Sequence, residues 1–230
     1  MKEILNIENK LIKICYNKTD EKILPVVILN NYSNDGEKIF DKCNEIGCKD
    51  FILVCISNLN WDDDMSPWYA PKINKNDTDF LGKADEYLKI LLEKIIPKVK
   101  EFVEINLEKQ IEYYVIAGYS LAGLFAVYSA YKTDLFNKIV SCSGSFWFPN
   151  FVEYVEKNRI STNIKQIYFS LENRESKTKN KVLQTVEENT KKTEKFLREQ
   201  GIKTIYEENE GNHFQSADLR IAKGIKWILK

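Results

Sequence analysis

The sequence predicts an α/β fold with a mostly parallel central sheet and helices on both faces. Apolar runs of strand length recur along the chain, and segments with helical apolar spacing lie between them. Several apolar runs are continuous rather than alternating, which is typical of strands buried on both faces of a parallel sheet. This alternation favours right-handed βαβ units. We expect one such domain over residues 1–230.

The elements follow from the apolar pattern. The expected strands are residues 11–15, 23–29, 51–56, 113–117, 139–142 and 167–171, with a weaker one at 204–206. The clearest helical spacing is that of Leu88, Leu91, Leu92, Ile95 and Ile96. The expected helices are residues 37–46, 84–105 (interrupted or ended around Pro97), 121–131, 180–200 and 217–229.

Charge and composition exclude several classes of protein. Lys plus Arg and Asp plus Glu number 34 each, so no net positive field favours nucleic acid or an anionic membrane as partner. No apolar stretch approaches the roughly 20 residues of a membrane span. The start, MKEILNIENK, lacks the apolar run of a secretory signal, so we expect a cytoplasmic protein.

The cysteines indicate reduced, packed thiols rather than a disulfide framework, because they are odd in number and scattered. They are Cys15, Cys43, Cys48, Cys55 and Cys142. No pair of Cys or His stands at zinc spacing, so we expect no metal site. The long stretch at 57–78 has no regular period, and we interpret its three aspartates at 62–64 as a solvated acidic turn.

One segment carries the strongest chemical signal. The strand at 113–117 is followed by GYSLAG at 118–123 and then by an apolar helix. This is the context in which a G-x-S-x-G turn presents a nucleophilic serine. Strand and helix approach closely there, so the residues flanking the serine must be small. Gly118 meets that need and Ala122 adds one methyl group, so we interpret Ser120 as the nucleophile.

The same turn predicts where an oxyanion would be stabilised. Because Ser120 lies at a helix N-terminus, the backbone N–H of Leu121 points toward the developing charge. A second donor is expected from the loop after an early central strand. The backbone N–H of Tyr32 is the first candidate there, and that of Asn31 is the second.

The only histidine, His213, is the candidate general base. It lies in a glycine-containing loop before the last helix, which is expected to open at the carboxyl edge of the sheet beside Ser120. The acid that orients the imidazole should follow an intervening strand. Glu175 is favoured over Glu172 because the loop must reach outward, and a Ser-His dyad is the alternative.

On these motifs the sequence resembles the "Putative esterase" family of α/β-hydrolases, which includes esterase D-type thioesterases, feruloyl esterase domains, trilactone siderophore esterases and mycolyl transferases. The resemblance spans most of the chain. It rests on GYSLAGLF (118–125), SCSGSFW (141–147), SPW (66–68), the stretch from FLG (80–82) to IP (96–97), and GNHF (211–214).

The resemblance implies the α/β-hydrolase fold and a Ser120–Glu175–His213 triad. Glu175 matches the family's acid position, and Glu172 stands where a glycine is frequent three residues earlier. The family's early strand often ends in His-Gly or Asp-Gly, whereas this chain has Asn-Asn there. The second oxyanion donor therefore stays open between the two candidates.

Several side chains near these motifs are candidate substrate contacts. The aromatic candidates are Trp68, Tyr69, Phe146 and Trp147, whose flat faces could hold an acyl or aromatic group. The alternative is that they are core residues. Arg174 could receive an anionic group, with a surface role as the alternative.

The residues and the resemblance together predict a serine-dependent carboxylic ester hydrolase. It would act through an acyl-enzyme on a small or siderophore-type ester, with no cofactor or metal. The alternatives are a thioesterase or acyltransferase with the same triad, and a catalytically silent binding module on the fold. The expected partner is a small-molecule ester, and the sequence carries no signal for oligomeric state.

Overall fold

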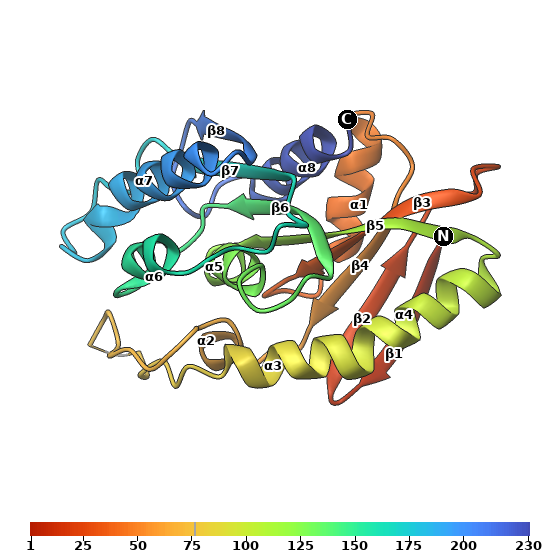
Figure 1. The fold of residues 1–230 in the computed structure, drawn as a ribbon, viewed down its shortest axis with the longest axis horizontal. Helices are drawn as coiled ribbons and strands as arrows, with labels where there is room; N and C mark the ends of the chain where they lie inside the picture. Colours follow the sequence, from red (N-terminus) through yellow and green to blue (C-terminus); the bar gives the residue numbers. More distant parts are fainter. Residues whose placement is uncertain (76) are drawn as a thin grey trace.

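The computed structural model describes residues 1–75 and 77–230 and contains an eight-stranded sheet in the order β1-β2-β4-β3-β5-β6-β7-β8 (Figure 1). β1 and β2 are antiparallel to their neighbours, and the strands from β4 through β8 are parallel. The predicted α/β class with a mostly parallel sheet is confirmed. The strands are β1 (Lys2–Ile7), β2 (Lys10–Cys15), β3 (Ile23–Asn30), β4 (Ile52–Ser57), β5 (Gln110–Tyr119), β6 (Phe136–Cys142), β7 (Gln166–Glu172) and β8 (Lys203–Asn209).

The strand register brings the carboxyl ends of the strands to one edge. Asn30 at the end of β3 pairs with Gly118 on β5, and Tyr119 pairs with Cys142 at the end of β6. The loops that follow β3, β5 and β6 therefore leave the sheet at the same level. This is the edge at which parallel α/β sheets place their ligand sites.

Helices cover both faces of the sheet, as predicted. The helices are α1 (Gly36–Glu45), α2 (Trp61–Asp64), α3 (Ala84–Ile90), α4 (Ile96–Glu101), α5 (Leu121–Ser129), α6 (Phe151–Lys157), α7 (Val186–Glu199) and α8 (Ala217–Ile228), with short π or 3₁₀ segments at η1 (Leu91–Ile95), η2 (Phe102–Asn106) and η3 (Leu183–Thr185). α1 and α8 pack on one face, while α3, α5, α6 and α7 pack on the other. Both faces are apolar because the central strands are buried on both sides.

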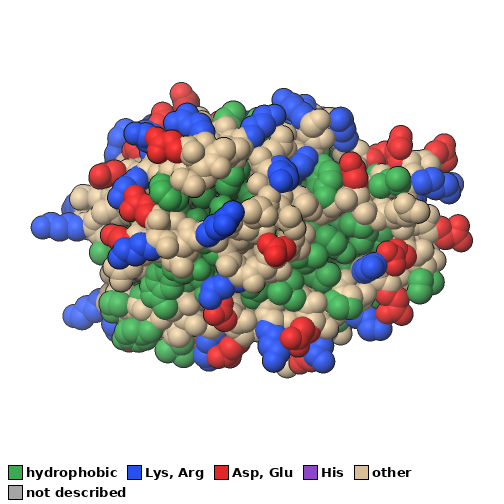
Figure 2. Space-filling view, in the orientation of Figure 1, with side chains coloured by type: hydrophobic (Ala, Val, Ile, Leu, Met, Phe, Trp, Pro, Cys, Tyr) green, Lys and Arg blue, Asp and Glu red, His purple; other side chains and the backbone are tan. Residues whose placement is uncertain are grey.

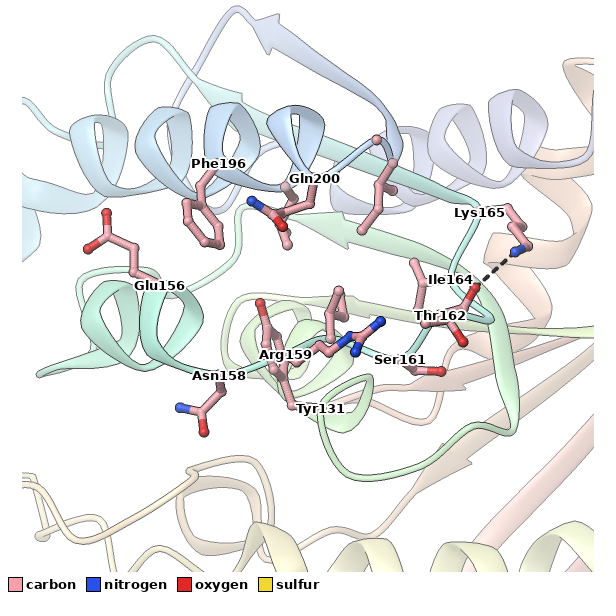
Figure 3. A pocket seen from close by; sticks show the side chains of 14 residues that line it. Tyr131, Glu156, Asn158, Arg159, Ser161, Thr162, Ile164, Lys165, Phe196 and Gln200 are labelled. Carbon is pink, nitrogen blue, oxygen red and sulfur yellow. Dashed lines mark hydrogen bonds between the residues drawn. The ribbon is translucent and has the colours of Figure 1, made fainter.

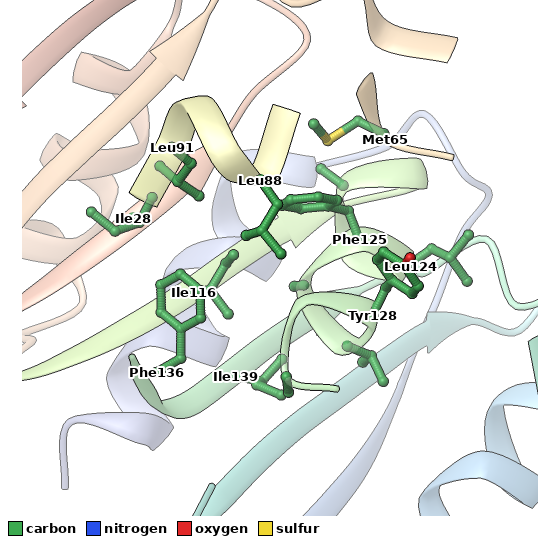
Figure 4. Close-up of a cluster of buried hydrophobic side chains, with 14 of the residues drawn as sticks. Ile28, Met65, Leu88, Leu91, Ile116, Leu124, Phe125, Tyr128, Phe136 and Ile139 are labelled. Carbon is green, nitrogen blue, oxygen red and sulfur yellow. The ribbon is translucent and has the colours of Figure 1, made fainter. Parts of the chain in front are cut away.

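The larger core lies between the sheet and the helices α3 and α5 (Figure 4). Ile28 and Ile116 on adjacent strands meet Leu88 from α3 and Phe125 from α5. Every residue of α5 is buried, so the helix that follows the serine turn is fixed on all sides. A rigid element of this kind is a suitable support for a reactive side chain.

Several elements differ from the sequence prediction, and the helices α2 and α6 were not predicted. β1 was not predicted; it is an edge strand with mostly exposed residues and so lacks a continuous apolar run. The helix from Ala84 continues past Pro97 to Asn106, because π segments on either side of α4 absorb the missing hydrogen bond. The expected helix at 180–200 begins as α only at Val186.

The aspartates near α2 also differ from their prediction as a solvated turn. Asp63 and Asp64 are buried. Asp64 accepts from Lys10 Nζ at 2.5 Å, and Asp63 accepts from the backbone N–H of Leu81 at 3.0 Å. These partners offset the free-energy cost of burying the two carboxylates. The residues therefore anchor the loop rather than face solvent.

The surface mixes charges of both signs, and Figure 2 shows them scattered over one face with apolar patches between them. The described residues form no helix with the length and apolar content that a membrane crossing needs.

Candidate active site

Ser120 occupies a strained turn between β5 and α5. Its backbone has φ 59° and ψ −125°, a region that non-glycine residues rarely adopt. A side chain at Gly118 would place its Cβ 2.3 Å from the backbone of Ala122. The methyl of Ala122 fits because Gly118 leaves that space empty, so the missing second glycine does not distort the turn.

The structure brings Ser120, His213 and Glu175 into one line of contacts. His213 Nε2 lies 3.0 Å from Ser120 Oγ, and His213 Nδ1 lies 2.8 Å from Glu175 Oε2. The three side chains come from the turn after β5, the loop after β8 and the loop after β7. With Nδ1 donating to the carboxylate, Nε2 is the atom that accepts the serine proton.

The environment of His213 favours the neutral imidazole. Burial lowers the pKa of His213 to about 4. The Glu175 carboxylate, whose side chain is 5% exposed, acts in the opposite direction, because it stabilises the protonated ring. The imidazole is therefore a free base near neutral pH. When it accepts a proton, the adjacent Glu175 carboxylate stabilises the positive charge.

Glu172, the alternative acid, pairs with groups other than the imidazole. Its carboxylate forms an ion pair with Arg220 and accepts from the hydroxyl of Ser143 at 2.6 Å. Its backbone N–H donates to Glu175 Oε1 at 3.2 Å. Of the two carboxylates, only that of Glu175 contacts the histidine ring.

The candidate oxyanion donors differ in availability. The backbone N–H of Asn31 donates to the carbonyl of Ile56 at 2.9 Å and is therefore occupied. Within residues 1–75 and 77–230, the N–H groups of Leu121 and Tyr32 have no acceptor. The N–H groups of Leu121 and Tyr32 are therefore free to donate, whereas that of Asn31 is already used in the sheet.

A cavity of about 420 Å³ opens beside Ser120 and His213. Its wall is mainly apolar and aromatic, with two carboxylates. The lining residues that the sequence did not single out are Ser33, Asp35, Ile39, Trp61, Tyr119, Phe214, Ala217, Asp218 and Ile221. Tyr119 and Phe214 adjoin Ser120 and His213 in the sequence, and Trp61 follows β4, so proximity to the motifs was their available signal.

The predicted aromatic contacts do not line this cavity. Phe146 is fully buried and packs against Phe151, with ring centroids 5.6 Å apart. Trp68 packs against Phe148 with ring centroids 5.9 Å apart. Phe146 and Trp68 are therefore core residues, which was the alternative interpretation. They contact the core because the apolar layer beneath α6 needs large side chains to fill it.

The other three predicted contacts also lie elsewhere. Trp147 packs against Phe80 with ring centroids 6.0 Å apart. Tyr69 is exposed and its hydroxyl donates to Asp79 at 2.9 Å. Arg174 is exposed and does not line the cavity, as the alternative interpretation of a surface residue expects.

A second cavity, of about 650 Å³, lies between α6 and α7 (Figure 3). Lys165 and Ile202, in its wall, precede β7 and β8, so this cavity lies at the amino edge of the sheet. It is therefore remote from Ser120. In the part of the chain that is described, no cluster of His, Cys, Asp and Glu has the composition of a metal site.

Comparison with known proteins gives a family match over most of the chain. The model of the Esterase family, described as "Putative esterase", matches residues 34–217. An uncharacterised protein of Bacillus subtilis (strain 168), YbbA, is 27% identical over 192 residues, which cover 80% of this chain and 74% of that protein.

Solved structures show the same fold. The siderophore hydrolase EstA from Aspergillus nidulans superposes with a TM-score of 0.72 at 16% identity, covering 100% of this chain and 93% of EstA. An IroE-like serine hydrolase from Shewanella oneidensis gives a TM-score of 0.75 at 18% identity, covering 99% of this chain and 79% of its own. The predicted α/β-hydrolase fold is confirmed.

Proposed function

Because the chain belongs to the "Putative esterase" family, we propose that it is a serine esterase that hydrolyses carboxylic esters through an acyl-enzyme on Ser120. The observation that carries the proposal is the unbroken set of contacts from Ser120 Oγ to His213 Nε2 at 3.0 Å and from His213 Nδ1 to Glu175 Oε2 at 2.8 Å. A serine, a base and an orienting acid in this order are what nucleophilic acyl transfer needs.

In the acylation step, Ser120 Oγ attacks the ester carbonyl carbon while His213 Nε2 takes its proton. The negative charge moves to the carbonyl oxygen, which accepts hydrogen bonds from the N–H groups of Leu121 and Tyr32. The carbonyl re-forms as the C–O bond to the alcohol breaks, and His213 returns the proton to the departing alcohol. Glu175 stabilises the imidazolium between the two transfers.

In the deacylation step, water replaces the alcohol. His213 takes a proton from the water as its oxygen attacks the acyl carbon, and the proton then returns to Ser120 as the acid leaves. The chain returns to its starting state. Each proton moves through His213 Nε2, so no group outside the three side chains and the two N–H donors is required.

The cavity beside Ser120 supports a small ester with an aromatic or apolar group as substrate. Tyr32 and Trp61 in its wall have ring centroids 5.3 Å apart at 84°. Aromatic walls of this kind hold flat apolar groups. We include siderophore-type esters among the candidate substrates because EstA from Aspergillus nidulans, which has a similar fold, is described as a siderophore hydrolase.

A panel of p-nitrophenyl esters, thioesters and trilactones tests the proposal with wild type, Ser120→Ala and His213→Ala. We expect the wild type to prefer oxygen esters, and each variant to lose about 10³-fold or more in kcat without losing its fold. Faster turnover of thioesters would favour a thioesterase instead. Equal turnover by wild type and Ser120→Ala would contradict the serine mechanism.

A further inference from the structure

A buried ionic cluster lies directly beneath the loop that carries His213, and no step of the proposed reaction uses it. Glu172 at the end of β7 and Arg220 on α8 form its ion pair, with side chains 0% and 3% exposed. The hydroxyl of Ser143 donates to Glu172 Oε2 at 2.6 Å. We call Glu172, Arg220 and Ser143, together with the half-buried Tyr119 that lies between them and the cavity, the buried cluster.

The buried cluster holds the loop at three backbone carbonyls. The hydroxyl of Tyr119 donates to the carbonyl oxygen of His213 at 2.8 Å. Arg220 donates to the carbonyls of Asn212 and Ser216, each at 3.4 Å. The contacts therefore fall on His213 itself and on both sides of it.

The two anchoring side chains also contact each other. The Arg220 guanidinium lies over the ring of Tyr119, 5.1 Å from its centroid, which is cation–π distance. Tyr119 immediately precedes Ser120, and the N–H of Glu172 donates to Glu175 Oε1 at 3.2 Å. The buried cluster thus connects the elements that carry the nucleophile, the base and the acid.

Apart from the buried cluster and Glu175, the loop is held to the β7 loop by the N–H of Gly211, which donates to Asn173 Oδ1 at 3.3 Å, and by hydrogen bonds within the loop itself. Residues 212 and 214–216 are polar or exposed on its outer side, and Phe214 is 90% exposed. Gly211 has φ 125°, a conformation open to glycine and rarely to other residues. Few apolar contacts and exposed backbone are the features of locally weak structure.

We propose that the Glu172–Arg220 ion pair, acting with Tyr119, is a positioning device that holds His213 within reach of the Ser120 hydroxyl. This inference rests on the proposed function. A displacement of about 1 Å at a reacting pair costs on the order of 100-fold in rate. The buried pair fixes the backbone that sets the distance of 3.0 Å between imidazole and hydroxyl.

The first test is the double variant Glu172→Gln/Arg220→Met, which removes both charges and so leaves neither one buried alone. Its matched control is Glu194→Gln/Arg198→Met on α7, where an ion pair of 3.7 Å has an arginine 60% exposed. We expect the double variant to lose about 10- to 100-fold in kcat with KM changed less than about threefold. The control keeps both constants.

A second variant, Tyr119→Phe, guards against simple misfolding, because it removes only the hydroxyl that donates to His213. It should lower kcat in the same direction at an unchanged melting temperature. A structural role alone would lower the melting temperature and leave kcat unchanged well below it. That result in both variants would overturn the proposal.

The pH profile supplies a readout that stability does not move. The titratable groups around His213 are Glu175, Tyr119, Arg220, and, across the cavity, Asp218 and Asp35. A looser loop gives the imidazole more water, so the burial that lowers its pKa is relieved. The acid limb of kcat/KM should therefore move to higher pH in Tyr119→Phe, and an unmoved limb would contradict the proposal.

Hydrogen exchange separates this inference from the proposed function. The N–H of Gln215 donates to the carbonyl of Asn212 at 3.1 Å within the loop. Its exchange should be faster in both variants than in wild type and unchanged in the α7 control. A wild type that hydrolyses no ester and takes no fluorophosphonate label refutes the proposed function, whereas unchanged Gln215 exchange overturns the positioning role itself.

Discussion

Replacement of Glu175 by Gln should slow ester hydrolysis by two to four powers of ten. The carboxylate is 5% exposed and lies 2.8 Å from His213 Nδ1, so the imidazolium formed during acyl transfer has a buried anionic partner. Loss of one partner from a buried ion pair costs about 3–5 kcal/mol. At about 1.36 kcal/mol for each factor of ten, this corresponds to about 10²- to 10⁴-fold in kcat.

Stopped-flow hydrolysis of p-nitrophenyl acetate measures this effect, since the burst reports acylation and the steady state reports turnover. KM should change little, because Glu175 does not line the cavity. Glu101→Gln is the control, since Glu101 accepts from Lys98 at 2.7 Å on the exposed side of α4. A Glu175→Gln variant within about threefold of wild-type kcat would refute the role of the acid and leave a Ser-His dyad.

Three further predictions follow from the geometry of the site. Gly118→Ala should lose activity and about 1–3 kcal/mol of stability in thermal unfolding, because its Cβ would lie 2.3 Å from the Ala122 backbone; wild-type activity would contradict this. Since burial lowers the pKa of His213 from 6.5 to about 4, the unfolded chain binds the extra proton between these pH values. The free energy of unfolding should therefore fall by up to about 3 kcal/mol as pH drops through this window. In urea titrations, His213→Gln should not show this pH-dependent loss of stability. Phe214→Ala should raise KM up to about tenfold because Phe214 lines the cavity, whereas Tyr69→Ala should not; equal KM values would remove Phe214 from the substrate contacts.

The sequence predicted the parts of the molecule that depend on local pattern. The parallel strands carry continuous apolar runs, and the serine turn carries small residues where strand and helix approach. The choice of Glu175 over Glu172 followed from the reach of a loop, and the structure places only Glu175 against His213.

The parts that depend on distant chain segments could not be predicted in the same way. Trp68 and Phe146 were candidates for substrate contact because they lie close to motifs, but the packing beneath α6 decides their place. The pairing of Glu172 with Arg220 joins residues 48 positions apart on a strand and a helix, so no local pattern marks it. Edge strand β1 was missed because its residues are mostly exposed.

The reactivity of the Ser120 hydroxyl is the most direct test of a serine nucleophile activated by His213. Intact-mass spectrometry after treatment with a fluorophosphonate should show one adduct on wild type, mapped to Ser120, and none on Ser120→Ala. His213→Ala should label more slowly by about 10²- to 10⁴-fold, because no base removes the proton. An adduct on Ser120→Ala, or equal labelling rates for wild type and His213→Ala, would contradict a serine activated by this histidine.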